Sequence, residues 1–300
     1  MTTLQNKIDF AVIFSVRNAN PNGDPLNGNR PRTDYSNYGE VSDVSIKRKL
    51  RDRLLERWIH AGRNDGDGNM IYVQADDRKA DDAASLRDRL EEAFGKELSK
   101  IGKEKLATQA CERWLDVRAF GSLFALKGDK SKKGKKKAVG GGDEDGDTGV
   151  SIGVRGPVTV QSAFSVEPID VTSVQITKSV NGEGDGVKVS SDRMGTKHRV
   201  DRGIYVFKGS INPQLADRTG FSDADADAIK TALTRLFEND ESSARPSGSM
   251  EVLKVIWWKH NSRAGQHSSA RVHRSLGVNP DGSYRLDLLE GLVAEEIDGA

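Results

Sequence analysis

Large apolar side chains recur at every second position over residues 8–16, near the start of the chain. This period of two predicts a β-strand with one buried side. The apolar positions on that side are Ile8, Phe10, Val12, Phe14 and Val16. A polar segment over residues 17–41, rich in Asn, Pro, Gly and Arg, follows it. Because long ordered loops are usually functional, this segment is a candidate for a binding loop.

A period of about four then predicts an amphipathic helix over residues 43–59. Its core stripe consists of Ile46, Leu50, Leu54 and Trp58. Ser42 or Asp43 precedes the first turn and is suited to cap it. Three basic side chains of its early turns lie off the stripe, namely Lys47, Arg48 and Arg51. The helix therefore begins with a basic face.

Weaker patterns complete the predicted elements. Apolar spacing predicts a helix carrying Leu86, Leu90, Phe94 and Leu98, another carrying Leu106, Ala110 and Trp114, and a third over residues 223–237. Strands are predicted over residues 69–74, 151–166, 171–180, 203–211 and 252–258, the last buried on both faces. Strands mixed with helices in this order fit an α+β fold with a ferredoxin-like or RRM-like sheet.

Residues 127–149 break this pattern with a run of lysines, three glycines and a run of acidic residues. With almost no apolar side chains, the segment cannot offset the entropy lost on ordering. We expect a flexible charged insert within one elaborated domain that covers residues 1–300.

Composition narrows the function classes. The net charge is only +1, which argues against a uniformly basic nucleic-acid binder but not against a local basic patch. Cys111 is the only cysteine, so neither an internal disulfide nor a cysteine zinc cluster is possible. No apolar run approaches the roughly 18 residues of a membrane span, so no membrane association and a cytoplasmic location are expected.

Motifs for catalysis or cofactors are missing from the sequence. The acidic triplet of Asp143, Asp145 and Asp147 lacks the glycine and the terminal ligand of a calcium loop. No cofactor and no metal are therefore expected. His260, His267 and His273 share a polar stretch with several arginines, which predicts surface positions, with phosphate contact as the alternative.

The basic helix start carries the most chemistry. Free N–H groups and the positive end of the helix dipole favour phosphate beside Lys47, Arg48 and Arg51. The alternative is a solvated helix face. Aromatic residues make up only 6% of the chain, so stacking on bases is not favoured, whereas recognition of phosphates and shape is.

Four segments follow one another along the chain: RNANPNGDP at residues 17–25, DVRAFG at 116–121, VRGPV at 154–158 and DRMGTKH at 192–198. Together and in this order they closely resemble the CRISPR Cascade backbone family (Cas seven), and within it the type I-C group. The resemblance implies an RRM-like palm with inserted finger loops and a thumb β-hairpin over residues 174–198. It also implies copies stacked head to tail along one guide RNA (crRNA) in a helical filament.

The resemblance further implies which residues contact the guide. The first loop supplies Arg17, Asn18 and Asn20, and the helix start supplies Ser45, Lys47, Arg48 and Arg51. Polar positions beside the RNA groove are Arg118 and Arg155, the thumb supplies Met194, Lys197 and His198, and a later loop supplies Arg245 and Ser247. Met194 is either a wedge at a kinked base or an ordinary core methionine.

The predicted function is a non-catalytic backbone subunit that binds the crRNA guide and presents it to target DNA in antiviral defence. Its expected partners are further copies of itself and the other Cascade subunits, which in type I-C are the processing or cap subunit and the large subunit. One alternative is an RNA-cleaving subunit of the type III kind that uses Asp24 or Asp34. Another is a protein-interaction module whose basic face serves only solubility.

Overall fold

The computed structural model describes residues 2–64, 66–126, 150–177 and 194–300. Their contacts divide the chain into two compact units. Unit 1 comprises Met1–Gln5, Leu54–Val158 and Asn212–Ala226, and unit 2 comprises Asn6–Arg53, Thr159–Ile211 and Asp227–Ala300. Within the described ranges we find no helix with the length and apolar content needed to span a bilayer.

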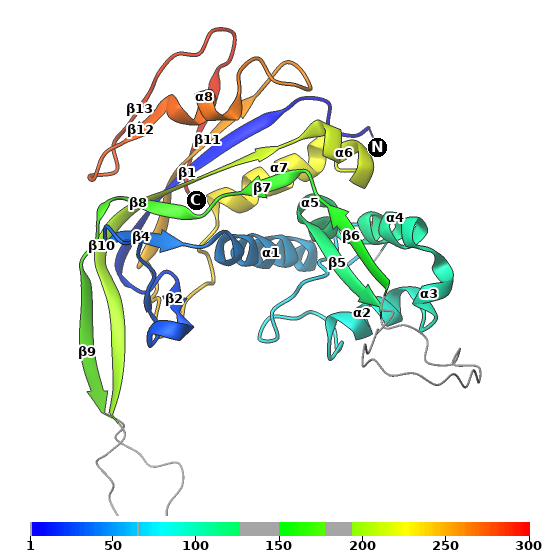
Figure 1. Cartoon of the computed structure of the whole chain (residues 1–300), viewed down its shortest axis with the longest axis horizontal. Helices are drawn as coiled ribbons and strands as arrows, with labels where there is room; N and C mark the ends of the chain where they lie inside the picture. Colours follow the sequence, from blue (N-terminus) through cyan, green and yellow to red (C-terminus); the bar gives the residue numbers. More distant parts are fainter. Residues whose placement is uncertain (1, 65, 127–149, 178–193) are drawn as a thin grey trace, which may run out of the picture. The chain divides into compact units, whose positions relative to one another are not determined.

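The elements follow one another along the chain as in Figure 1. The strands are β1 (Ile8–Ala19), β2 (Gly23–Asp24), β3 (Arg30–Pro31), β4 (Tyr38–Val41), β5 (Gly121–Leu126), β6 (Val150–Arg155), β7 (Val158–Val160), β8 (Ala163–Pro168), β9 (Val171–Thr177), β10 (Met194–Ile211), β11 (Met250–Lys259), β12 (Leu276–Val278), β13 (Tyr284–Leu286) and β14 (Ala294–Asp298). The helices are the 3-10 turn η1 (Pro25–Asn27), α1 (Asp43–His60), α2 (Leu86–Phe94), α3 (Leu98–Ile101), α4 (Lys103–Arg113), α5 (Leu115–Phe120), α6 (Pro213–Thr219), α7 (Asp223–Thr234) and α8 (Ser269–Arg274).

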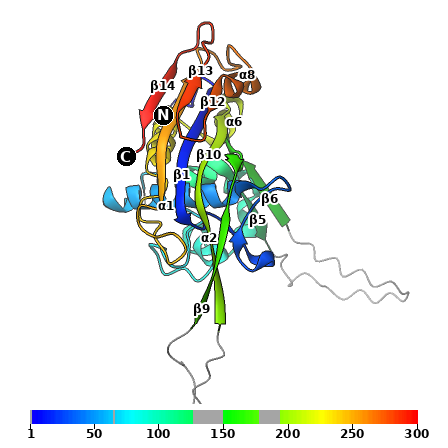
Figure 2. The ribbon, with the colours of Figure 1, turned by 90° about the vertical axis from the view of Figure 1, so that its left-hand side faces the viewer.

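Unit 2 is built on a large antiparallel sheet with the strand order β14-β11-β1-β10-β8-β4. Strand β1 lies between β10 and β11, with Phe10 opposite both Gly209 and Trp257. Figure 2 shows these central strands side by side, with β9 continuing the pairing along the first half of β10. The predicted mixed α/β architecture with a buried strand over residues 252–258 is confirmed by this sheet.

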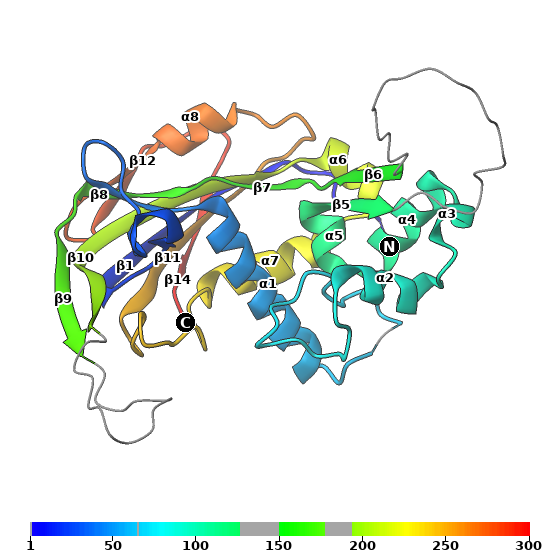
Figure 3. The ribbon, with the colours of Figure 1, turned by 60° about the horizontal axis from the view of Figure 1, so that its bottom comes forward.

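Apolar layers cover both faces of the sheet in unit 2. On one face, the ring of Phe14 lies 5.3 Å from Tyr205 and 5.0 Å from Phe237. On the other face, Ala11, Ile13, Ile256 and Trp258 pack against Val272 of α8 and Leu276 of β12, and Figure 3 shows α8 above this side. Strand β1 is thus buried on both faces, and the prediction of one buried side was incomplete because short residues such as Ala11 also face a core.

Unit 1 has a smaller core around Trp114, between α4 and α5. The Trp114 ring lies 4.7 Å from Tyr72 and 5.3 Å from Phe94. The predicted strand over residues 69–74 was wrong, since its backbone forms only an isolated bridge from Met70 to Trp114. Leu98 also begins a helix of its own, because Gly95 with φ of 85° ends α2.

Segments that looked uniform in the sequence are also divided. The predicted strand over residues 151–166 is split into β6, β7 and β8, and the polar segment over residues 17–41 contains β2, η1, β3 and β4. The helix predicted to reach Phe237 ends as α7 at Thr234. The predicted charged insert at residues 127–149 and the tip of the predicted thumb lie outside the described residues.

The predicted surface positions of His260 and His273 were wrong. Both side chains are buried beside Asp9, which lies on the central strand β1. His260 Nε2 donates to Asp9 Oδ2 at 2.9 Å, because its Nδ1 accepts from the Gln266 backbone N–H at 3.0 Å. Burial lowers the pKa of His273. A buried carboxylate needs polar partners, and for Asp9 these are histidines from a stretch whose sequence is mostly polar.

Gly121 and Gly156 lie where β5 begins and β6 ends in unit 1, with their backbones in close contact, and Gly156 offers a test of the fold. A Cβ on Gly156 would lie 2.2 Å from the Ala119 carbonyl oxygen and 2.6 Å from the Gly121 nitrogen. Gly156→Ala is therefore expected to lower the free energy of unfolding by about 2–3 kcal/mol, as measured by urea denaturation. The matched control is Gly153→Ala on β6, whose Cβ would meet only Leu123 Cδ1 at 4.0 Å. Equal stability of the two variants would contradict this packing.

Candidate nucleic-acid interface

The end of β1, where the predicted first loop begins, exposes a basic and an amide side chain. Arg17 and Asn18 are exposed, and Asn18 has the left-handed φ of 50°. Arg17 stands directly opposite Arg202 of β10, which is exposed as well. Like charges in direct opposition destabilise a strand pair. This pair is therefore suited to a surface that meets an anion.

Asn20 is buried within the same loop and organises it. Its Nδ2 donates to the Asn29 carbonyl oxygen at 2.7 Å, which closes the small hairpin of β2 and β3. Its Oδ1 has no hydrogen-bond partner within the described residues. A buried amide oxygen without a protein donor is a position that a water or a ligand donor can satisfy.

The two carboxylates of the first loop are engaged in its turns. Asp24 accepts from the Leu26 backbone N–H at 3.2 Å and from Arg32 at 3.4 Å. Asp34 accepts from the backbone N–H groups of Ser36 and Tyr38 at 2.8 and 2.9 Å. These contacts account for both side chains as turn-forming residues.

Helix α1 begins next to this loop. Ser42 Oγ accepts from the Ser45 backbone N–H at 3.3 Å, which makes Ser42 the cap, and the Ser42 N–H donates to Asn22 Oδ1 at 2.9 Å. Lys47 pairs with Asp43 at 2.9 Å, and Arg48 lies 3.9 Å from Asp52 while about half exposed. Arg51 is half-buried on the same helix. The basic start of α1 therefore presents a solvent-accessible guanidinium at Arg48.

A second loop, residues 240–249, is fastened to the first. The Asn20 backbone N–H donates to the Ala244 carbonyl at 2.8 Å, and the Arg17 N–H donates to the Ser249 carbonyl at 2.7 Å. This loop carries Arg245, which is half-buried, and Ser247, which is exposed. The structure thus brings together three sets of predicted residues, from the first loop, the start of α1 and this second loop. We call this group the basic seam; it consists of Arg17, Asn18, Asn20, Ser45, Lys47, Arg48, Arg51, Arg245 and Ser247.

The paired strands β9 and β10 carry the described part of the predicted thumb. Lys197 is exposed opposite Val174, and His198 is half-buried opposite Ser173. His198 Nδ1 lies 2.8 Å from Ser173 Oγ, which also accepts from Arg30 Nη1 at 3.1 Å. Arg30 therefore links the first loop to this hairpin, and the sequence patterns did not single it out. Met194 begins β10, but its side chain and residues 178–193 lie outside the described residues.

Arg118 has a role inside unit 1 that was not predicted. Its side chain is only 10% exposed. It makes a two-pronged contact with Asp225, at 2.9 and 2.7 Å, and donates to the carbonyl oxygens of Gly68 at 3.0 Å and Cys111 at 2.7 Å. Since a guanidinium has five N–H donors, these four hydrogen bonds leave little for a ligand.

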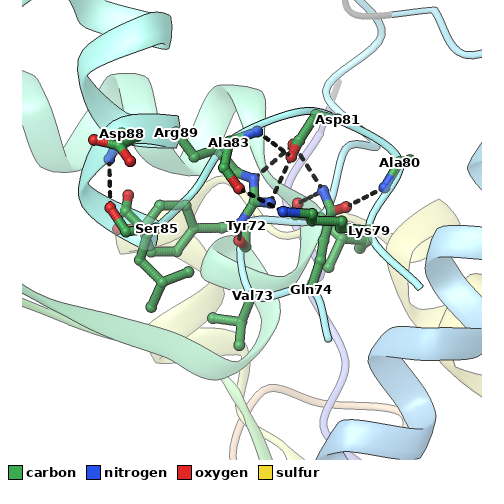
Figure 4. Close-up of polar contacts among 12 residues, drawn as sticks. Tyr72, Val73, Gln74, Lys79, Ala80, Asp81, Ala83, Ser85, Asp88 and Arg89 are labelled. Carbon is green, nitrogen blue, oxygen red and sulfur yellow. Dashed lines mark hydrogen bonds and ion pairs between the residues drawn. The ribbon is translucent and has the colours of Figure 1, made fainter. Parts of the chain in front are cut away.

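Asp116, the acidic residue of the segment DVRAFG that contains Arg118, also makes its contacts inside unit 1. Asp116 is fully buried and accepts from the backbone N–H groups of Tyr72 and Val73 at 2.7 and 3.1 Å. The neighbouring turn is closed by Arg89, which binds Asp81 through two hydrogen bonds of 2.6 Å and the Tyr72 carbonyl at 2.7 Å (Figure 4). Arg155, by contrast, is exposed at the end of β6.

The described ranges offer neither a metal-binding cluster nor a reactive thiol for catalysis. Those ranges hold no cluster of three or more His, Cys, Asp or Glu side chains that could bind a metal ion. Burial raises the pKa of the Cys111 thiol to about 11, so it is protonated at neutral pH and a poor nucleophile.

Comparison with known proteins identifies the family. Residues 6–288 match the family described as CRISPR-associated protein Cas7, and this chain belongs to that family. A Haloferax volcanii protein named CRISPR-associated protein Cas7 is 25% identical over 302 residues, which cover 98% of this chain and 82% of the relative. The family predicted from the four sequence segments is thereby confirmed, whereas the type I-C group stays a prediction.

Two solved chains resemble this one more distantly. A chain from a "CRISPR RNA-guided surveillance complex, pre-nicking" is 14% identical with a TM-score of 0.44, covering 84% of this chain and 78% of its own length. A chain from a "CRISPR RNA-guided surveillance complex" is 18% identical with a TM-score of 0.45, covering 92% of this chain and 77% of its own.

Proposed function

We propose that this protein binds a crRNA guide as the backbone subunit of a type I-C CRISPR surveillance (Cascade) complex, without cleaving nucleic acid. The observation that carries the proposal is the basic seam of unit 2. Exposed Arg17 and Arg48 and half-buried Arg245 come from segments that hydrogen bonds tie together, between the backbones of the two loops and from the Ser42 N–H to Asn22. Membership of the Cas7 family supplies the biological setting.

The proposed grip is on the sugar–phosphate backbone. Arg17, Arg48 and the N–H groups at the start of α1 suit phosphate oxygens. We add Arg30 and Arg202 to the proposed contacts. We leave Arg118 out, because its donors are engaged inside unit 1.

The proposed architecture is an RRM-like palm, with finger loops and a thumb hairpin over residues 174–198. The sheet order β11-β1-β10-β8, with α1 after β1 and α7 between β10 and β11, supports the palm. It matches the split β-α-β arrangement of ferredoxin-like sheets. Paired β9 and β10 support the thumb. Copies would stack head to tail on one guide and present it for pairing with target DNA, beside the other Cascade subunits.

The central test is whether the purified protein carries RNA. We expect co-purified RNA of uniform length, with nuclease-protected segments at regular spacing, because repeated copies would cover repeated lengths of guide. RNA-free protein that also fails to bind added single-stranded RNA at low salt would overturn the proposal.

The ribonuclease alternative is tested by Asp24→Ala. Since Asp24 is engaged in a turn through Leu26 and Arg32, we expect the variant to retain guide and target binding within about twofold, with target RNA uncut by both proteins. The measurement is electrophoresis of labelled target RNA and DNA after incubation with guide-loaded protein, and Asp34→Ala is tested in parallel because Asp34 is the other candidate of this alternative. Cleavage by the wild type that is lost in either variant would favour the ribonuclease.

A further inference from the structure

A buried lysine lies behind the basic seam. Lys49, on α1, is 5% exposed, and Asp240, at the start of the second loop, is 8% exposed. Lys49 Nζ donates to Asp240 Oδ2 and lies 5.6 Å from the centroid of the Phe237 ring. Lys49 thereby holds the Asp240 carboxylate, at the start of the second loop, beside α1 and the Phe237 ring.

The same carboxylate oxygen also holds Arg245. Arg245 Nε donates to Asp240 Oδ2 at 2.8 Å and, less closely, to the Asp240 carbonyl oxygen at 3.3 Å. Within the described residues, the two Nη groups of Arg245 have no hydrogen-bond partner, and the side chain is 25% exposed. One edge of the guanidinium is thus anchored, while the Nη groups remain available to a ligand.

Charge is unbalanced in this cluster. Two cations, Lys49 and Arg245, share one carboxylate, and Arg48 immediately precedes Lys49 on α1. Burial, followed by repulsion from Arg245 and Arg48, lowers the pKa of Lys49 to about 8 against the attraction of Asp240. Lys49 and Asp240 balance each other, so the additional positive charge of the partly exposed Arg245 can attract an anion at the surface. The ligand chemistry that fits is a phosphate.

We propose that Lys49 and Asp240 are positioning residues, which hold Arg245 with its Nη groups directed to one phosphate of the bound RNA. This rests on the proposed guide-binding function and extends it to two residues outside the predicted site. A guanidinium anchored through Nε loses less freedom on binding and can grip two phosphate oxygens at once. The link from Ala244 to Asn20 keeps Arg245 beside the first loop.

A double-mutant cycle tests the proposal with the full chain and a synthetic single-stranded RNA. Lys49→Met and Asp240→Ala are combined in one variant, so that no buried lysine is left unpaired. Arg245→Ala is expected to weaken binding about tenfold or more and to reduce the slope of log affinity against log salt by about 0.7. The Lys49→Met/Asp240→Ala variant is expected to lose most of the same affinity. Adding Arg245→Ala to it is expected to cost almost nothing more.

The matched control is Glu241→Ala, which removes an exposed acid next to Asp240 and should not weaken binding. Full affinity in the Lys49→Met/Asp240→Ala variant, or additive losses in the triple variant, would overturn the positioning role. Urea denaturation of each variant separates affinity from folding, since a purely structural role would lower stability and affinity alike even without Arg245. A wild-type protein that binds no RNA would instead overturn the proposed function itself.

Discussion

Arg118→Met is expected to lower the free energy of unfolding by about 3–5 kcal/mol, as measured by urea denaturation. The substitution keeps much of the side-chain length but leaves Asp225, now without its cation, buried in unit 1. It also removes the donors to the Gly68 and Cys111 carbonyl oxygens. Removing one member of a buried pair costs more than the pair itself contributes, because the remaining charge stays desolvated.

The control for this variant is Arg87→Met on α2. Arg87 pairs with Glu91 at 2.6 Å but is 49% exposed, so its loss should cost no more than about 0.5 kcal/mol. A second comparison is Arg118→Met combined with Asp225→Leu, which removes the orphaned charge and should recover part of the stability. If Arg118→Met kept its stability and instead lost RNA affinity, the assignment of Arg118 to the RNA groove would be restored.

Replacing Lys47, Arg48 and Arg51 together with alanine is expected to weaken guide binding about 100-fold near ~0.1 M salt. Each phosphate contact on a single strand contributes about 0.7 to the slope of log affinity against log salt, so three lost contacts flatten it by about 2. Over the decade from ~1 M to ~0.1 M salt, that difference accumulates to the stated factor. Arg48 is 52% exposed and lies 3.9 Å from Asp52, so its guanidinium is accessible from solvent, where RNA would bind.

The measurement is a titration of labelled RNA at several salt concentrations. The control triple of Arg218, Arg235 and Arg285 removes the same charge from exposed positions on α6, after α7 and on β13, and should change the slope by less than about 0.7. An unchanged slope in the α1 triple would end the assignment of phosphates to this helix, as would an equal change in both triples.

Local periodicity predicted the elements that organise unit 2. The period of four over residues 43–59 predicted α1 with its bounds displaced by a single residue, and all four stripe residues are buried. Alternation predicted the start of β1, and the β-branched run predicted β11. These predictions succeeded because amphipathic spacing is a property of a short segment, and a buried face stabilises it wherever the segment packs.

Predictions failed where a distant partner decides the outcome. Asp225 is 107 residues from Arg118, and no spacing in the sequence connects them. His260, which contacts Asp9, is 251 residues away from it in the sequence, within a stretch whose composition predicts exposure to solvent. Residues 69–74 have the apolar content of a strand, but the backbone N–H groups of Tyr72 and Val73 donate to a side chain, Asp116, in place of a neighbouring strand.

The sequence alone determined that residues 43–59 form a helix and that residues 8–16 and 252–258 form strands, which family the chain belongs to, and which cations stand at the start of α1. Only the tertiary structure decided how those cations are used. It buried Arg118 against Asp225, anchored Arg245 on Asp240 and Lys49, and brought Arg30 to the β9–β10 hairpin. The physical reason is that periodicity acts over a few residues, whereas the energy of a charge depends on its burial and on the partners that folding places within about 4 Å.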